Sequence, residues 1–202
     1  MVPLRRGEAP RILKEKAAEW TTAYLAQCAD EKKPRPRSDR YGHREVREEL
    51  RRMSHGKCFY CERRLAEADE EVDHYVEVEA RRDLAFEWSN LYLSCATCNS
   101  RKAADSRIPN ADCVDPCDTA RRPADHLAFD DELAVPRDDR GRATVQKYRL
   151  DRDELDLIRG RFLKGFMKRL DTVKDAMIAD GRKTFSDQER EILRRYRDPA
   201  MP

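Results

Sequence analysis

HGKCFYCERRLAEADEEVDHYVEVEARRDLAFEWSNLYLSCATCNSRKA, residues 55–103, is the stretch that decides the fold of this protein. It holds two C-x-x-C pairs, Cys58 with Cys61 and Cys95 with Cys98. Because the turn inside each pair brings both sulfurs to one side, two pairs can complete a tetrahedral all-cysteine site, the usual ligand set of structural zinc. We therefore predict a structural Zn²⁺ with no open coordination position for catalysis. The alternative is that the pairs are redox motifs or occur by chance.

The segment between the two pairs is predicted to be a small folded insert, since its 33 residues exceed the usual spacing of a zinc ribbon. Apolar alternation in EEVDHYVEV, residues 70–78, predicts a strand. NLYLSC, residues 90–95, predicts a second strand, and TCNSRKAA, residues 97–104, can begin a helix. The expected order is therefore two strands and a short helix, with metal ligands between them.

The segment before this stretch is predicted to be helical. Residues 10–28 carry apolar side chains at helical spacing, and residues 42–54 place Val46, Leu50 and Met53 on one face. DEKKPRPRSDR, residues 30–40, separates the two helices, and its prolines and charges predict an exposed linker.

The segment after this stretch is predicted to contain a loop and then a hairpin. Residues 104–126 are rich in proline and aspartate and show little periodicity, which predicts a loop. Residues 127–150, LAFDDELAVPRDDRGRATVQKYRL, predict a hairpin that turns around Gly141.

The C-terminal segment is predicted to be helical. Asp151 and Glu154 can begin a helix that runs to about Asp180 and ends at Gly181. A capping box formed by Ser186 and Glu189 predicts a final helix; in such a box each side chain accepts a hydrogen bond from the other residue's backbone N–H. The predicted fold is thus α+β, with four regions at 1–54, 55–103, 104–150 and 151–202.

Composition gives no general attraction to nucleic acid. The 202 residues are 39% hydrophobic and 41% charged, with a net charge of +2, so the core is modest and any attraction to phosphate is local. Residues 31–64 have a surplus of six basic side chains, whereas residues 66–90 hold nine acids against two arginines. A basic arm beside an acidic patch suits an enzyme that holds a phosphate backbone and a divalent cation. Solvated helix faces would produce the same runs.

The compartment is expected to be the cytoplasm, without a membrane partner. No apolar run approaches the ~20 residues that cross a bilayer. The opening MVPLRRGEAPRI lacks the apolar stretch of a signal peptide. In that compartment, paired cysteines act as metal ligands more readily than as disulfides.

Three short motifs lie in the insert or directly after it: Asp73-His74, Asn90-Leu91 and C-N-x-x-K at residues 98–102. Together with the two C-x-x-C pairs, they resemble the HNH endonuclease superfamily in its four-cysteine form. The resemblance covers residues 55–103. It implies a ββα-metal core stapled by the zinc knuckle and flanked by N- and C-terminal helices. It also implies metal-dependent cleavage of nucleic-acid phosphodiesters, whether DNA or RNA.

The resemblance assigns roles that suit this chemistry. Phosphodiester hydrolysis needs a nucleophilic water, a cation on the scissile phosphate and stabilisation of the leaving oxygen. His74 is implied to be the general base, because a histidine near neutrality can take a proton from water. Asp73 and Asn99 are implied to hold Mg²⁺ or Mn²⁺, because both offer hard oxygen ligands. Many family members have histidine where this chain has Asn99, which leaves the metal preference open.

Further residues around the motifs receive supporting roles by resemblance. Asn90 is implied to fix the loop that holds the base. Lys102 and Arg101 are implied to neutralise phosphate. In the family, the residues after the Asp-His pair often include a proline, whereas this chain has Tyr-Val-Glu-Val. Glu77 in this segment could be an extra metal ligand or face solvent, and we expect it to face solvent. Taken alone, His74 would be interpreted as a structural histidine.

The other histidines are interpreted structurally. His43 lies among charges in a predicted helix and is expected at the surface. His55 precedes the first cysteine pair and could cap that turn. His126 repeats the Asp-His pair without flanking cysteine pairs, so we expect a structural role.

The remaining cysteines are also interpreted structurally. Cys113 and Cys117 have C-x-x-x-C spacing in a loop, but no other ligand pair accompanies them, so a second metal site is not favoured. Cys28 is expected to be a core residue of the first helix.

Three stretches suggest a narrower resemblance, which spans residue 5 to about residue 165. They are RRGEAPRILKE at 5–15, HGKCFYCE at 55–62, and PADHLAFDDEL followed by GRATVQKYRLDRDELDLIR within 123–159. They resemble the HNH proteins of bacterial anti-phage operons, the PtuB-like nucleases of Septu systems and the HNH effectors of some retrons. This resemblance implies an ATPase partner encoded nearby. Two alternatives stay open: a stand-alone restriction-type or homing-type nuclease, and a non-catalytic zinc module that binds nucleic acid or a protein.

The C-terminal helices offer two interpretations. Leu155, Ile158, Phe162 and Phe166 recur at helical spacing and could form a docking surface for a partner. The protein's own core could equally cover them, which is the commoner case.

Overall fold

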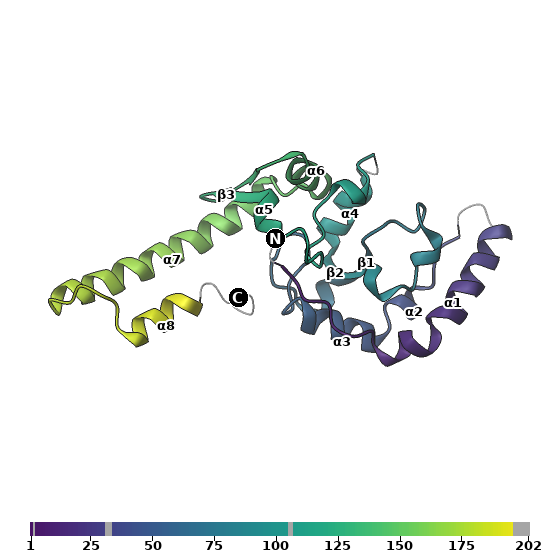
Figure 1. Cartoon of the computed structure of the whole chain (residues 1–202), viewed down its shortest axis with the longest axis horizontal. Coiled ribbons are helices and arrows are strands. Elements are labelled where there is room, and N and C mark those ends of the chain that lie inside the picture. Colours follow the sequence, from purple (N-terminus) through teal and green to yellow (C-terminus); the bar gives the residue numbers. More distant parts are fainter. Residues whose placement is uncertain (2, 31–33, 105–106, 196–202) are drawn as a thin grey trace.

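The computed structural model describes residues 1, 3–30, 34–104 and 107–195, and it has the predicted α+β fold (Figure 1). The strands are β1 (Glu70–His74), β2 (Leu91–Cys95), β3 (Leu127–Asp130) and β4 (Leu133–Pro136). The helices are α1 (Arg11–Asp30), α2 (Ser38–Tyr41), α3 (Arg44–Met53), α4 (Ala96–Ala104), α5 (Pro123–His126), α6 (Asp139–Tyr148), α7 (Asp153–Ala179) and α8 (Asp187–Arg195). Short 3-10 turns occupy Glu67–Asp69, Arg82–Leu84, Trp88–Asn90 and Asn110–Asp112.

The centre of the fold is the predicted ββα unit. β1 and β2 pair antiparallel, with His74 opposite Leu91 and Asp73 opposite Tyr92. α4 begins at Ala96, directly after the last residue of β2, so the second cysteine pair lies at the strand-to-helix junction. The first pair is attached to the same sheet, because the backbone N–H of Phe59 donates to Leu93 O at 2.8 Å.

The predicted N-terminal helices are confirmed. Val46, Leu50 and Met53 are buried on α3 as expected from their spacing. The predicted linker at 30–40 is partly wrong, because Ser38–Tyr41 forms the short helix α2. Residues 31–33 of that linker lie outside the described residues, and 34–37 have no secondary structure.

The predicted turn at Gly141 is wrong, because Gly141 lies inside α6. The hairpin is instead formed by β3 and β4, with its turn at Asp131, where φ is +49°. The Asp138 side chain begins α6 by accepting a hydrogen bond from Gly141 N at 2.8 Å. A Cβ on Gly141 would lie 2.0 Å from His126 O, so the glycine permits close packing and not a turn.

α7 is the 27-residue helix predicted near the C-terminus. It ends at Ala179, two residues before Gly181, whose φ of +64° suits a helix terminus. The predicted start at Asp151 is wrong, since the N-cap is Arg152 and its side chain makes no capping bond. Figure 1 shows α7 projecting from the body of the molecule.

The capping box before α8 is confirmed. Ser186 N donates to Glu189 Oε2 at 2.7 Å, and Glu189 N donates to Ser186 Oγ at 3.2 Å. Figure 1 shows α8 turning back beneath α7. Among the residues that the structure describes, no helix is both long and apolar enough to span a bilayer.

Candidate functional site

Four cysteines meet at the junction of the first turn, β2 and α4. The Sγ atoms of Cys58, Cys61, Cys95 and Cys98 all lie within 4.8 Å of one another. Backbone amides support them, because Cys95 N lies 3.3 Å from Cys58 Sγ and Cys98 N lies 3.4 Å from Cys95 Sγ. Four sulfurs at this spacing fit a closed, tetrahedral zinc site.

Arg152 adds a positive charge to this cluster from the start of α7. Its Nη2 donates to Cys98 Sγ at 3.2 Å. Four thiolates around one Zn²⁺ would carry a net charge of −2, and the guanidinium would offset part of that charge. A partner outside the ligand set also orients the ligand that it bonds. The projecting helix α7 is therefore joined to the cysteine cluster at its first turn.

His74 ends β1 and is nine-tenths buried. Its Nε2 lies 2.8 Å from the carbonyl oxygen of Ala85, and the ring of Tyr41 packs edge-on at 4.7 Å. A carbonyl only accepts, so Nε2 carries the proton and Nδ1 is left as an acceptor. Burial lowers the pKa of His74, which favours the neutral ring.

Asn90 closes the loop that carries Ala85. Its Oδ1 accepts from Val76 N at 2.7 Å, and its Nδ2 donates to Val76 O at 3.1 Å and Leu84 O at 3.2 Å. These three bonds tie both ends of the loop between β1 and β2 together. Asn90 thereby fixes the position of the carbonyl that bonds His74.

Asp73 points to the opposite face of β1 from His74, since side chains alternate along a strand. Its two carboxylate oxygens lie 2.8 and 2.7 Å from Lys102 Nζ, and the Tyr60 hydroxyl donates to Oδ2. Burial raises the pKa of Tyr60 well above its ordinary value, so the phenol stays protonated and donates. Tyr60 lies inside the first cysteine pair, which joins the knuckle directly to Asp73.

Lys102 is buried, whereas its implied phosphate-binding role requires an exposed side chain. It is 2% exposed, and its ammonium is paired with Asp73 and bonded to His74 O, not free at the surface. Arg101, the other implied phosphate contact, is exposed on α4. Of the two basic residues of α4, Arg101 is therefore the one open to solvent.

Asn99 and Glu71 approach each other between α4 and β1. Asn99 is half-buried, and its Nδ2 donates to Glu71 Oε2 at 2.8 Å. Glu71 lies two residues before Asp73, so both carboxylates are on the β1 face that α4 covers. Sequence reasoning missed Glu71, although its i, i+2 spacing from Asp73 on a predicted strand could have pointed to it. Asp73 and Asn99 offer a carboxylate and an amide oxygen, which are the kinds of ligand that Mg²⁺ and Mn²⁺ prefer.

Two residues differ from expectation. Glu77 does not face solvent, because its Oε1 lies 2.7 Å from Lys147 Nζ, whose side chain is 1% exposed. A buried ammonium needs such a partner. His43 is not a residue of the helix surface but the N-cap of α3, where its Nδ1 accepts from Glu45 N at 3.3 Å.

The remaining histidines and cysteines lie outside this site. His126 Nδ1 is 2.6 Å from Asp138 Oδ2, next to the start of α6. His55 is exposed in a left-handed conformation with φ of +55°. Cys28 packs in a small apolar cluster with Phe86 and neighbours. Within the described part of the chain, neither Cys113 nor Cys117 belongs to a metal-binding group.

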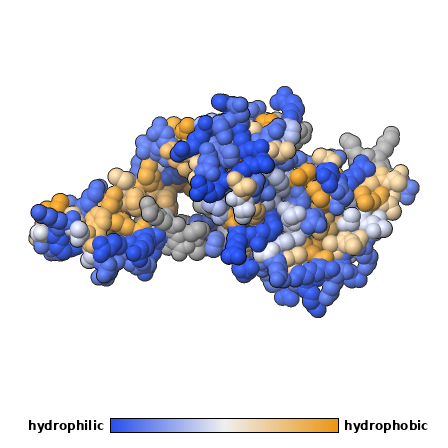
Figure 2. Space-filling model, in the orientation of Figure 1, coloured by the Kyte–Doolittle hydropathy of each residue, from blue (hydrophilic) through white to orange (hydrophobic). Residues whose placement is uncertain are grey.

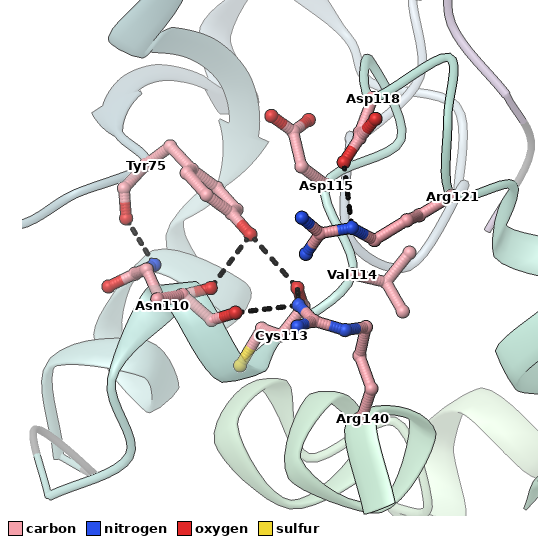
Figure 3. Close-up of a pocket in the computed structure, with 9 residues that line it drawn as sticks. Tyr75, Asn110, Cys113, Val114, Asp115, Asp118, Arg121 and Arg140 are labelled. Atoms are coloured by element: carbon pink, nitrogen blue, oxygen red, sulfur yellow. Dashed lines mark hydrogen bonds and ion pairs between the residues drawn. The ribbon is translucent and has the colours of Figure 1, made fainter. Parts of the chain in front are cut away.

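A small cavity of about 130 Å³ lies beside Tyr75, the residue after His74 (Figure 3). The Tyr75 hydroxyl points to Asn110 O at 3.1 Å, and Arg140 donates to Ala111 O at 2.6 Å and Cys113 O at 2.8 Å. The Tyr75 bond anchors the loop after α4 to the end of β1, and the Arg140 bonds anchor it to α6.

Residues 58–105 match the family model described as HNH endonuclease. The ββα unit with its four cysteines is therefore an HNH domain. The chain is also similar to a Septu protein PtuB of Bacillus thuringiensis, with 29% identity over 178 residues that cover 86% of this chain and 63% of that protein. A Septu protein PtuB of Bacillus mycoides (strain KBAB4) is 24% identical over 193 residues, covering 79% of this chain and 61% of that protein.

These matches confirm the predicted resemblance to HNH endonucleases and to PtuB proteins. The matched segment of the HNH domain begins at Cys58, the first residue of the cysteine cluster. The chain spans less than two thirds of the length of either relative.

Proposed function

We propose that this protein is a metal-dependent HNH endonuclease that cleaves nucleic-acid phosphodiesters in the cytoplasm, as the nuclease of an anti-phage defence system. The observation that carries the proposal is the pair at the end of β1 within the HNH domain. There, His74 is held through Nε2 by Ala85 O at 2.8 Å, and its neighbour Asp73 faces the helix that carries Asn99. The similarity to PtuB proteins supports the defence role.

In this proposal, each residue has a distinct task. His74 takes a proton from water at Nδ1, and the water oxygen attacks phosphorus. Asp73 and Asn99 would hold a divalent cation, which would supply charge stabilisation at the phosphate and the leaving oxygen. Arg101, exposed on α4, contacts the phosphate backbone, and Asn90 keeps the Ala85 carbonyl in place behind the base.

The catalytic cation is distinct from the zinc of the knuckle. Four cysteines leave a zinc ion no open position, so the knuckle supplies the scaffold alone. Hard oxygen ligands hold Mg²⁺ or Mn²⁺ more weakly than thiolates hold zinc, so the two ions can be separated by a mild chelator.

A cleavage assay with metal added back tests this function. The full chain is treated with EDTA under conditions that retain one Zn²⁺, and is then offered single- and double-stranded DNA and RNA. We expect cleavage only after Mg²⁺ or Mn²⁺ is added. Absence of cleavage on every substrate with either metal would favour a non-catalytic zinc module. Cleavage that continues in EDTA would contradict the separate catalytic cation.

We further propose that an ATPase encoded in the same operon, of Septu or retron type, binds the apolar groove beside α7. The groove has a volume of about 670 Å³ and lies between the first cysteine turn, the β3–β4 hairpin and α7. Ile158, Phe162 and Phe129 line it and are 41%, 45% and 52% exposed, so the protein's own core does not cover them. Figure 2 shows hydrophobic residues gathered along the projecting arm.

Co-expression with the neighbouring ATPase tests this partner. Phe162→Asp should abolish co-purification, because it places a charge in the groove. Ile178→Asp is the matched control, since Ile178 is 68% exposed on the same helix and does not line the groove. Loss of the complex in both variants, or in neither, would contradict this docking site. A gene without an ATPase neighbour would favour a stand-alone nuclease.

A further inference from the structure

Glu71 is a half-buried carboxylate in the HNH domain that has no role in the chemistry described so far. It lies on β1, two residues before Asp73, and its Oε2 accepts a hydrogen bond from Asn99 Nδ2 at 2.8 Å. Asn99 comes from α4, so this bond connects β1 to α4. The proposed cation site lies between these two elements.

The bond decides which end of the Asn99 amide is free. An asparagine side chain has a donating NH₂ end and an accepting carbonyl end, and only the carbonyl oxygen can ligate a hard cation. An ionised carboxylate only accepts hydrogen bonds. Glu71 therefore selects the orientation in which Nδ2 faces the strand and Oδ1 is left for a metal.

We propose that Glu71 is a positioning residue, which orients the Asn99 amide so that its Oδ1 can bind the divalent cation. The inference rests on the proposed function, because it assigns Glu71 to the same cation site. Partners that orient a metal ligand typically contribute about 10- to 100-fold to metal affinity. A flipped Asn99 amide would present its NH₂ end to the cation. An acidic residue in this position disfavours that flip.

Mn²⁺ binding, followed by electron paramagnetic resonance of the free ion, separates positioning from direct ligation. The zinc-loaded full chain is titrated as wild type, Glu71→Gln, Glu71→Val, Asn99→Ala and the double variant Glu71→Val/Asn99→Ala. Glutamine keeps a carbonyl oxygen that can accept from Asn99 Nδ2, whereas valine suits a strand but accepts nothing.

Positioning predicts a specific pattern of dissociation constants. Glu71→Gln should stay within about 3-fold of wild type, and Glu71→Val should weaken Mn²⁺ binding by about 10- to 100-fold. The double variant should bind no more weakly than Asn99→Ala, because Glu71 acts only through Asn99. Zinc content and circular dichroism establish that each variant is folded, and the Glu71→Gln result decides the question even if the valine variant does not fold.

Three outcomes would overturn the inference. Glu71→Gln binding as weakly as Glu71→Val would show that the charge of Glu71, and not its hydrogen bond to Asn99, supports the cation. Unchanged affinity in Glu71→Val would leave it without a role at the cation. A double variant weaker than Asn99→Ala would show that Glu71 acts independently. A wild-type protein that binds no Mn²⁺ would instead contradict the proposed function itself.

Discussion

Consecutive side chains at the end of β1 serve two faces of the same strand. His74 turns to the loop between β1 and β2, where Ala85 O fixes its tautomer. Asp73 turns to α4, where it meets Lys102 and the Tyr60 hydroxyl. A one-residue shift in register would exchange the two faces, so the positions of the proposed base and the proposed acidic ligand depend on the pairing of β1 with β2.

The buried ion pair between Asp73 and Lys102 gives a residue-scale prediction. Their side chains are 7% and 3% exposed, and breaking such a pair by removing one partner leaves an uncompensated buried charge. Lys102→Met should therefore lower the free energy of unfolding of the zinc-loaded protein, in buffer without Mg²⁺ or Mn²⁺, by about 3–5 kcal/mol. Urea denaturation measures this change.

The double variant Asp73→Asn/Lys102→Met is the control for this prediction. It removes both charges, so it should lose less stability than Lys102→Met alone. Equal losses in the single and the double variant would mean that the pair is not what stabilises the site.

At the scale of single residues, the sequence pointed to candidate side chains but not to the partners that surround them. The Asp73-His74 motif is recognisable from the sequence because its two residues are consecutive. The burial of Lys102 was not, because it depends on α4 packing across β1. Glu71 was missed for the same reason, since only the packed helix brings Asn99 to it.

Among the elements, the prediction succeeded where apolar residues recur at helical spacing. It failed at a glycine, because glycine occurs both in turns and where a helix packs closely. The spacing of Val46, Leu50 and Met53 is typical of a helix face, and the structure buries all three. Glycine suits turns, so the sequence predicts a turn at Gly141. Gly141 lies inside α6, because the helix passes too close to His126 O for a side chain to fit.

Two glycine substitutions test this packing at the element scale. Gly141→Ala should destabilise the protein by about 1–3 kcal/mol, because its Cβ would lie 2.0 Å from His126 O. Gly165→Ala is the matched control in α7, where nothing lies within 4 Å of the added Cβ. It should stabilise the protein by roughly 0.5–1 kcal/mol, since alanine favours a helix interior. Thermal unfolding in which both variants behave alike would contradict the close approach.

In the molecule as a whole, the cysteine cluster links the HNH domain to the projecting helix α7. The first cysteine turn bonds to β2 and to Asp73, while Arg152 at the start of α7 bonds to Cys98. Tyr60 also stacks on Tyr148 of α6 at 4.2 Å. The knuckle therefore joins the strand β1, the helix α6 and the projecting helix α7.

Removal of zinc should thus unfold the whole HNH domain and not the cysteine knuckle alone. Elemental analysis should find about one Zn²⁺ per chain, and Cys58→Ser should lose the metal and the folded HNH domain, because metal binding and folding are coupled in such sites. Near-ultraviolet circular dichroism follows the aromatic packing around Tyr60. A variant that is folded and free of zinc would contradict a structural role for the metal.

Whole-molecule architecture was the part least accessible from the sequence. The helical spacing of Ile158 and Phe162 was equally typical of a covered face and of a docking surface. Their exposure of 41% and 45% follows from α7 leaving the body, which no local pattern reveals. The four cysteines, in contrast, were recognisable from spacing alone, because the C-x-x-C turn is local.

The most direct measurement of the central claim is single-turnover cleavage by His74→Ala at saturating Mg²⁺ or Mn²⁺. His55→Asn is the matched control, an exposed histidine of the same stretch in a left-handed conformation that asparagine tolerates. With both variants zinc-loaded and folded, His74→Ala should cleave at least about 100-fold more slowly than wild type, and His55→Asn should be unchanged. Cleavage by His74→Ala at the wild-type rate would contradict the assignment of His74 as the general base.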